Sequence, residues 1–123
     1  MRLWHESLIT RLPRQQLLGQ HREVCALRGN GWERRHRTVD YVFGYSPYKL
    51  YQYHELIMKE MKKRGYKPDA IWEDPLYRGK SCPAHVALSE VEWTEPVYKE
   101  HDDLYLEECF LNLEEKGIYL REK

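Results

Sequence analysis

Residues 12–29 read LPRQQLLGQHREVCALRG and contain the clearest structural pattern in the chain. A proline near the start suits the first turn of a helix, where its missing N–H group is not needed. Gly29 stands where a helix commonly ends. We therefore predict a helix that opens at Leu12-Pro13, runs through Arg28 and packs one face against a core. That face is a stripe at helical spacing: Leu17, His21, Val24 and Arg28.

A second helix is predicted from Ser46 to Arg64. Ser46 and Pro47 are a typical N-cap and first-turn pair, and Gly65 is the expected stop. Its core-facing residues recur at helical spacing: Leu50, His54, Ile57 and Met61.

The rest of the chain has weaker signals. Residues 38–43 are expected to be extended or a short helical segment, and residues 74–81 form a loop around Pro75 and Gly79. Pro83 is predicted to start a short helix through Val91. A last helix should begin at Asp102 or Asp103 and end before Gly117. The expected fold is all-α: one compact domain over residues 1–123, with three to four helices and long loops.

Length and composition indicate a small cytoplasmic protein. The 123 residues suit one domain, and no stretch approaches the about 20 apolar residues of a membrane-spanning helix. The start, Met-Arg-Leu-Trp, lacks the apolar region of a secretory signal. Three widely spaced cysteines, Cys25, Cys82 and Cys109, are expected to be reduced thiols in or near the core.

Positive charge is concentrated near the N-terminus, although the whole chain has zero net charge. Residues 1–37 contain eight Lys and Arg against three Asp and Glu, a net charge of +5. Residues 81–123 contain four against eleven, a net charge of −7. This asymmetry is compatible with a basic face for nucleic acid. It is equally compatible with halves that interleave without forming a patch, and charge alone leaves both open.

Glu23 lies in the middle of the first predicted helix. A glutamate there is usually a solvated surface charge. Two neighbours favour a functional role, because Arg22 is adjacent and Gly19 lies one turn earlier. A glycine inside a helix costs about 1 kcal/mol relative to alanine, so its presence suggests that something must approach Glu23 closely.

Arginines and histidines in and after the first helix are candidates for phosphate contacts. Arginine binds phosphate bidentately, and an exposed ring such as Trp32 can stack on a base. The alternative is a solvated polar loop. His54 differs, because it lies on an apolar stripe and is expected to be a hydrogen-bonded core residue. The candidates for DNA contacts are His21, Arg28, Arg34, Arg35, His36 and Arg37.

Several kinds of site have no motif in this sequence. No histidines have the spacing of a zinc-binding motif, and no cysteine pair has that of a zinc knuckle. Glycine-rich phosphate loops and nucleophile elbows are also missing. We therefore expect no metal and no cofactor. Composition and spacing predict a helical domain with a basic N-terminal half, and they identify no reaction.

Several stretches resemble the pyrimidine-dimer DNA glycosylase and abasic-site lyase family, the phage endonuclease V-like enzymes. Residues 12–23 look like the first helix of that family, with an Arg-Glu pair at the same distance from the start. Residues 54–66 are similar to its second long helix and the turn after it. A weaker similarity covers residues 77–79 and 83–85. The stretches occur in the family's order, in a chain of the family's size.

The resemblance implies an enzyme that removes a UV-damaged pyrimidine from double-stranded DNA and then cleaves the abasic site. Its nucleophile would be the N-terminal α-amine, and Glu23 would be its essential carboxylate. Arg22 would hold a phosphate beside the lesion, while Arg2 and Arg78 would also contact DNA. The family bends DNA and flips out a nucleotide. We expect a monomer that needs no protein partner.

Two departures from the family pattern bear on these roles. In the phage enzyme the initiator methionine is removed and a threonine supplies the amine. Here the bulk of Arg2 should prevent that removal, so the amine belongs to Met1 and Arg2 overlies the next arginine of the family. The family also has an arginine where this chain has Ala26, and we expect Arg28 to substitute for it.

Two other classes of function stay open. A non-catalytic nucleic-acid-binding module on the same scaffold would bind DNA in a salt-dependent way, and its function would not depend on Glu23. A protein-interaction domain would show no such binding. The sequence also leaves the lesion open: pyrimidine dimers are the family's hallmark, and oxidised or ring-opened purines are alternatives.

Overall fold

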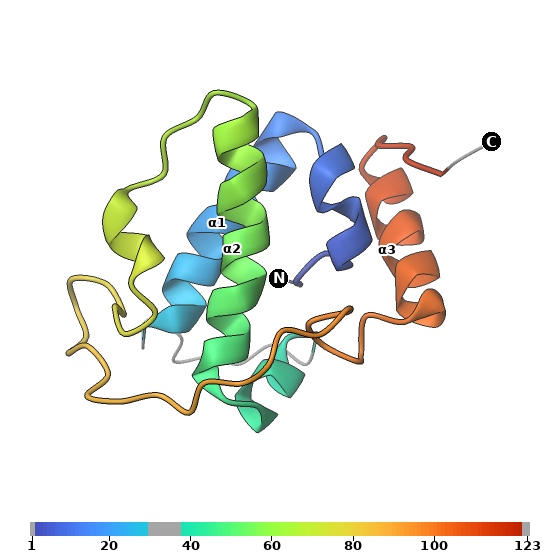
Figure 1. Cartoon of the computed structure of the whole chain (residues 1–123). Coiled ribbons are helices and arrows are strands. Elements are labelled where there is room, and N and C mark those ends of the chain that lie inside the picture. Colours follow the sequence, from blue (N-terminus) through green and yellow to red (C-terminus); the bar gives the residue numbers. More distant parts are fainter. Residues whose placement is uncertain (1, 30–37, 122–123) are drawn as a thin grey trace.

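Helices make up the regular structure of this protein, a computed structural model that describes residues 2–29 and 38–121 (Figure 1). In chain order the elements are η1 (Glu6–Arg11), α1 (Arg14–Arg28), η2 (Asp40–Gly44), α2 (Pro47–Lys63), η3 (Ala70–Glu73) and α3 (Asp103–Glu115), where η marks a 3-10 helix. The described residues include no strand. The fold is therefore all-α, as predicted.

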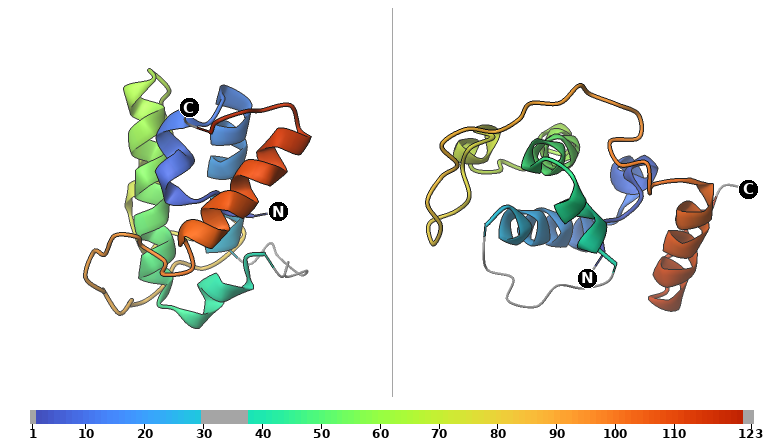
Figure 2. Two further views of the ribbon diagram at one scale, coloured as in Figure 1. Left: turned by 90° about the vertical axis from the view of Figure 1, so that its right-hand side faces the viewer. Right: turned by 90° about the horizontal axis from the view of Figure 1, so that it is seen from below.

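The helix α1 packs along α2, and the segment that contains η1 lies between α2 and α3 (Figure 2). Leu3 and Trp4, which precede η1, are thus buried between helices. Buried apolar side chains come from all of these elements: Leu3, Leu8, Leu17, Val24, Leu27, Leu50, Ile57, Met61, Cys109 and Leu113.

The bounds predicted for the three α-helices are confirmed, because local capping signals set them. The Ser46 hydroxyl accepts a hydrogen bond from the Tyr48 amide at 3.2 Å and so caps the start of α2. Gly65 has φ +90°, a left-handed conformation that ends the helix and suits glycine. The short helical alternative for residues 38–43 is also confirmed, since η2 spans Asp40–Gly44.

Gly29 ends α1 for a different reason. Its φ is −85°, which any residue can adopt. A Cβ atom at this position, however, would lie only 2.7 Å from the Arg78 carbonyl oxygen. Only glycine therefore lets the backbone of residue 78 approach this position, and the loop lies directly against the end of α1.

The helix predicted from Pro83 to Val91 is wrong, because residues 74–102 contain no helix. This segment crosses the end of α2 and reaches α3 (Figure 1). Side chains of the α2 region bind its backbone: Ser46 donates to the Ser89 carbonyl at 2.6 Å, and Gln52 donates to the Val91 carbonyl at 2.9 Å. Val86 is 99 % exposed, so this apolar side chain contributes nothing to the core.

The cysteines lie as predicted. Cys109 is buried, Cys25 and Cys82 are half-buried, and no disulfide joins them. Within the described part of the chain, no helix has both the length and the apolar character needed to cross a membrane.

Candidate active site

Glu23 is half-buried on α1, and its carboxylate is held by a neighbour on the same helix. The side-chain nitrogen Nε2 of Gln20 donates a hydrogen bond to Glu23 Oε2 at 3.0 Å. Burial raises the pKa of Glu23 above its ordinary value. The Gln20 hydrogen bond and the positive charges of Arg22 and Lys116 oppose this rise. The balance of these effects leaves the pKa of the Glu23 carboxyl group above its ordinary value.

Gln20 connects Glu23 to the start of the chain. Its side chain is almost fully buried, with 1 % exposure. The same Nε2 atom that bonds Glu23 also donates to the Arg2 carbonyl at 3.1 Å, and Gln20 Oε1 accepts from the Trp4 amide at 2.6 Å. The Gln20 amide thus binds residue 2 through its nitrogen and residue 4 through its oxygen. The same nitrogen also binds Glu23, so the carboxylate lies close to these two residues.

Tyr53 of α2 completes this network. Its hydroxyl donates to the Trp4 carbonyl at 2.6 Å and lies 3.0 Å from Gln20 Oε1. Tyr53 is fully buried, and burial raises its pKa well above the ordinary value, so the hydroxyl stays a neutral donor. Neither Gln20 nor Tyr53 was predicted from the sequence. The one available signal was that Gln20 falls on the same helix face as Leu17, Val24 and Leu27, where a polar side chain needs a partner.

Arg22 is exposed on α1 next to Glu23. A Cβ atom added at Gly19 would lie 3.7 Å from Arg22 Nη2, which is an ordinary van der Waals distance. The glycine therefore leaves space beside the Arg22 guanidinium, and not beside the Glu23 carboxylate as the sequence suggested. An exposed guanidinium beside a half-buried carboxylate could hold a phosphate at the edge of the site.

Arg2 is directed toward α3. Its Nη1 atom lies 3.5 Å from Glu108 Oε1, and its guanidinium lies 5.7 Å from the centre of the Tyr105 ring. Nη1 is buried and makes no hydrogen bond with the described residues. The predicted DNA contact of Arg2 therefore requires its guanidinium to move away from α3.

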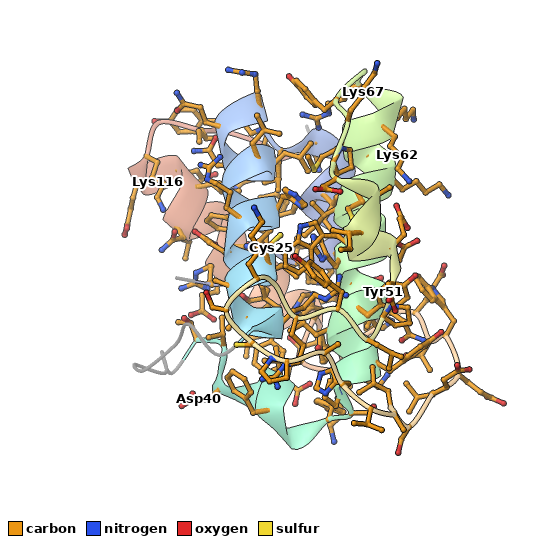
Figure 3. The ribbon with its side chains drawn as sticks, turned by 90° about the vertical axis from the view of Figure 1, so that its left-hand side faces the viewer. Cys25, Asp40, Tyr51, Lys62, Lys67 and Lys116 are labelled. Carbon is orange, nitrogen blue, oxygen red and sulfur yellow. The ribbon has the colours of Figure 1, made fainter. Side chains whose placement is uncertain are left out.

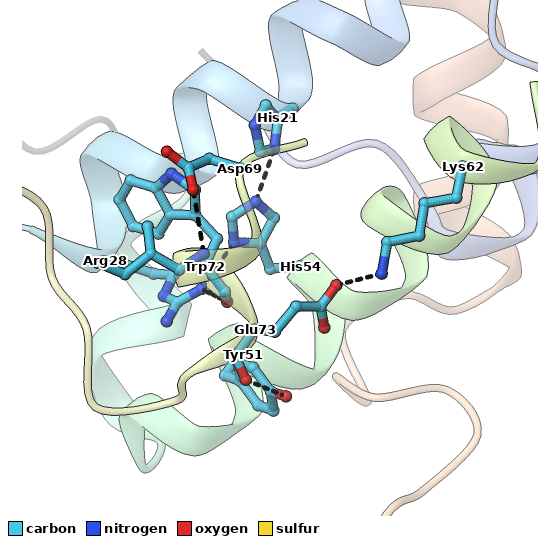
Figure 4. Close-up of polar contacts among 9 residues, drawn as sticks. His21, Arg28, Tyr51, His54, Lys62, Asp69, Trp72 and Glu73 are labelled. Atoms are coloured by element: carbon cyan, nitrogen blue, oxygen red, sulfur yellow. Dashed lines mark hydrogen bonds and ion pairs between the residues drawn. The ribbon is translucent and has the colours of Figure 1, made fainter. Parts of the chain in front are cut away.

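Arg28 is buried, with 7 % exposure, and its hydrogen bonds are made within the protein (Figure 4). Its guanidinium donates to the carbonyls of Trp72, Asp74 and Tyr77 at 2.7 to 3.0 Å. It also lies 3.0 Å from His54 Nδ1. Arg28 therefore fixes η3 and the segment after it against α1, and its buried side chain is not on the surface where DNA phosphates would lie.

His21, Cys25 and His54 form a group between α1 and α2 whose side chains come close enough to hold a metal ion, with ligand atoms within 4.8 Å of one another. Figure 3 shows Cys25 on α1, beside α2. His54 is buried and hydrogen-bonded, as predicted: its Nε2 lies 2.8 Å from His21 Nδ1. Burial lowers the pKa of both histidines, so both rings are neutral at physiological pH.

The contact with Arg28 disfavours a metal in this group. Arg28 can only donate, so His54 Nδ1 accepts and the neutral ring carries its proton on Nε2. A metal on Nε2 would need both ring nitrogens without a proton, whereas metal-bound histidines normally donate from the second nitrogen. The positive charge of Arg28 would also repel the ion. The three side chains are better explained as a hydrogen-bonded link between α1 and α2.

Arg78 is half-buried, and its Nε atom donates to the Arg28 carbonyl at 3.2 Å. It lines a cavity of about 310 Å³ at the end of α1, together with Phe43, Tyr77 and His85. The other predicted site residues, Met1, Arg34, Arg35, His36 and Arg37, lie outside the described part of the chain.

A comparison with protein families gave a match over the part of the chain that contains Glu23. The family described as pyrimidine dimer DNA glycosylase matches residues 1–74, which include α1, α2 and the Gln20 network. Searches among curated proteins and among solved structures gave no match. The family match ends before residues 77–85, so it does not test the weaker similarity there. Because it spans more than half of the chain, this protein belongs to the pyrimidine dimer DNA glycosylase family.

Proposed function

We propose that this protein is a DNA repair glycosylase with abasic-site lyase activity on UV-induced pyrimidine dimers. The α-amine of Met1 and the carboxylate of Glu23 carry out its chemistry. The observation that supports this most is the Gln20 amide, which bonds both Glu23 and the Arg2 carbonyl. Residue 2 is thus tied to Glu23 through one buried amide, and residue 1, which carries the proposed amine, is its neighbour in the sequence.

An α-amine suits this chemistry because its ordinary pKa of about 7.7–8.0 leaves a useful fraction neutral at physiological pH. Its lone pair attacks C1′ of the damaged nucleotide. The glycosidic electron pair leaves with the base, which takes the proton that the new ammonium loses. The nitrogen lone pair then opens the sugar ring, O4′ takes up a proton, and a protonated Schiff base forms.

The Schiff base is an electron sink for strand cleavage. Removal of a C2′ proton forms the C2′–C3′ double bond, and the C3′–O electron pair leaves with the 3′ phosphate. Water then hydrolyses the imine, which releases an unsaturated aldehyde and restores the amine. Each of these steps needs a group that can accept or return a proton.

Glu23 has the properties needed for this role. In its ionised form it stabilises the positive charge on the sugar and on the imine, and this effect is stronger where water is partly excluded. Its raised pKa brings it closer to the working pH, which favours proton transfer in both directions. Gln20 holds its position without neutralising it.

DNA binds along the face that carries Arg22. We propose that Arg22 and Arg2 contact phosphates next to the flipped nucleotide, and that Arg34, Arg35, His36, Arg37 and Arg78 extend this contact. His21 and Arg28 are left out of the proposed DNA contacts, because internal hydrogen bonds occupy them. We further propose that residues 1–123 form one domain that acts as a monomer in the cytoplasm.

Cleavage of a DNA duplex with a single thymine cyclobutane dimer tests this function. Untagged protein should cut at the dimer and leave the undamaged duplex intact, while Glu23→Gln should bind the damaged duplex with unchanged affinity and cut it at least about 100-fold more slowly. The same cleavage assay on duplexes with a ring-opened purine shows whether the protein prefers the pyrimidine dimer to that lesion. Salt-dependent binding without cleavage of any lesion would instead identify a non-catalytic binding module.

A further inference from the structure

Residues 2–4 are held from two sides. On one side Gln20 and Tyr53 bond the backbone of residues 2 and 4, as described above. On the other side lies α3. The Tyr105 hydroxyl of α3 donates to the Leu3 carbonyl at 2.5 Å, across 102 positions in the sequence. Three successive carbonyls, those of Arg2, Leu3 and Trp4, therefore each accept a hydrogen bond from a side chain.

Further contacts with α3 surround this bond. The Arg2 guanidinium lies over the Tyr105 ring and next to Glu108. The Lys116 ammonium lies 5.3 Å from the centre of the Trp4 ring. Chain termini are usually poorly ordered unless something ties them down. Here the hydrogen bond from the Tyr105 hydroxyl to the Leu3 carbonyl fixes the backbone of this segment on the α3 side.

Tyr105 is itself fixed. Its backbone amide donates to the Asp102 carboxylate at 2.8 Å and so belongs to the N-cap of α3. Its ring lies 5.2 Å from the buried His101 ring. Burial raises the pKa of Tyr105, so its hydroxyl keeps its proton and remains a donor across the physiological range.

We propose that Tyr105 is a positioning residue, which sets the N-terminal amine at its distance from Glu23 through the Leu3 carbonyl. This rests on the proposed amine chemistry. The family match covers residues 1–74, so α3 lies outside it and the match assigns no role to this helix. A reacting group displaced by about 1 Å can lose about 100-fold in rate, so the loss of one well-placed anchor should affect the chemistry more than the binding.

The test is Tyr105→Phe, which keeps the ring and its packing and removes the hydroxyl. Tyr119→Phe is the matched control, because Tyr119 follows α3 and is 75 % exposed. With untagged proteins and an abasic-site duplex, Tyr105→Phe should lower kcat for strand cleavage at least tenfold, while KM stays close to that of the wild type. The melting temperature should fall by a few degrees, because the carbonyl of the buried Leu3 loses its donor. Tyr119→Phe should behave as the wild type.

Hydrogen exchange provides a readout that does not depend on catalysis. In Tyr105→Phe the Trp4 amide should exchange faster, while amides in the middle of α2 keep their protection. Unchanged kcat in Tyr105→Phe would overturn the positioning role and leave the proposed function intact. A rise in KM as large as the fall in kcat would also overturn it, since that would show a general loss of structure and not a displaced reacting group. Failure of the wild type to cleave would instead contradict the proposed function itself.

Discussion

Gln20 donates to the Glu23 carboxylate through the same side-chain nitrogen that holds the Arg2 carbonyl, with distances of 3.0 and 3.1 Å. One buried amide thus sets the distance between a carboxylate in the middle of a helix and the first residues of the chain. If those two groups carry out the chemistry, Gln20 matters as much for their mutual position as for stability.

Replacement of Gln20 by Met tests this link. Methionine has a similar length and no hydrogen-bonding amide, so the Trp4 amide and the Arg2 carbonyl would lose their partners. We expect a loss of about 1–3 kcal/mol in the free energy of unfolding, together with a loss of strand cleavage of at least about 100-fold. Gln15→Met, at an exposed position of the same helix, is the control. Cleavage that survives in Gln20→Met would show that the amide does not position the reacting groups.

Glu23→Gln should change stability in a pH-dependent way. Burial raises the folded-state pKa of Glu23 above its ordinary value of 4.5, so folding disfavours the ionised form. This penalty is present above the folded-state pKa and disappears as the pH falls below about 4.5. Glu23→Gln should therefore raise the melting temperature at neutral pH and leave it unchanged at pH 4.

Thermal unfolding at both pH values measures this effect, with the exposed Glu115→Gln as control. A Glu23→Gln variant that is less stable at neutral pH would show that the carboxylate stabilises the fold. It would contradict the view that the ionised carboxylate lowers stability and is kept for the reaction.

The titration of Glu23 can be followed directly by carbon NMR in the free protein. Its pKa should lie above 4.5, and it should rise further in Arg22→Gln, because the Arg22 charge favours the ionised carboxylate. Arg14→Gln, exposed at the start of α1, should leave the pKa of Glu23 unchanged. A measured pKa at or below 4.5 would contradict the proposal that burial raises the pKa of Glu23.

Local signals were sufficient to predict the three α-helices and insufficient to predict the site. Pro13, Ser46 and Gly65 fixed the ends of α1 and α2 because capping depends on nearby residues. Residues 83–91 were predicted incorrectly, because their backbone partners are side chains about 40 positions earlier in the chain. Glu23 became a candidate through its neighbours Arg22 and Gly19 and through the family resemblance. Tyr105 gave no signal, because its contact with Leu3 forms only in the folded chain.

Arg28 and Arg22 should respond in opposite ways to mutation. Arg28→Met leaves three carbonyls and the buried His54 without their partner, so we expect a loss of about 1.5–3 kcal/mol in folding free energy and an unchanged salt dependence of DNA binding. Arg22→Gln should keep stability and reduce the slope of log K against log salt by about 0.9, the effect of one phosphate contact. A reduced slope in a folded Arg28→Met protein would show that Arg28 contacts a DNA phosphate.

Borohydride trapping tests the central claim most directly. Untagged protein is mixed with an abasic-site duplex, the imine is reduced, and the DNA-linked peptide is identified by mass spectrometry. We predict a single covalent adduct on the α-amine of Met1, lost when the N-terminus is extended and strongly reduced in Glu23→Gln. An adduct on a lysine, or no adduct from protein with a free N-terminus, would contradict amine chemistry at the start of this chain.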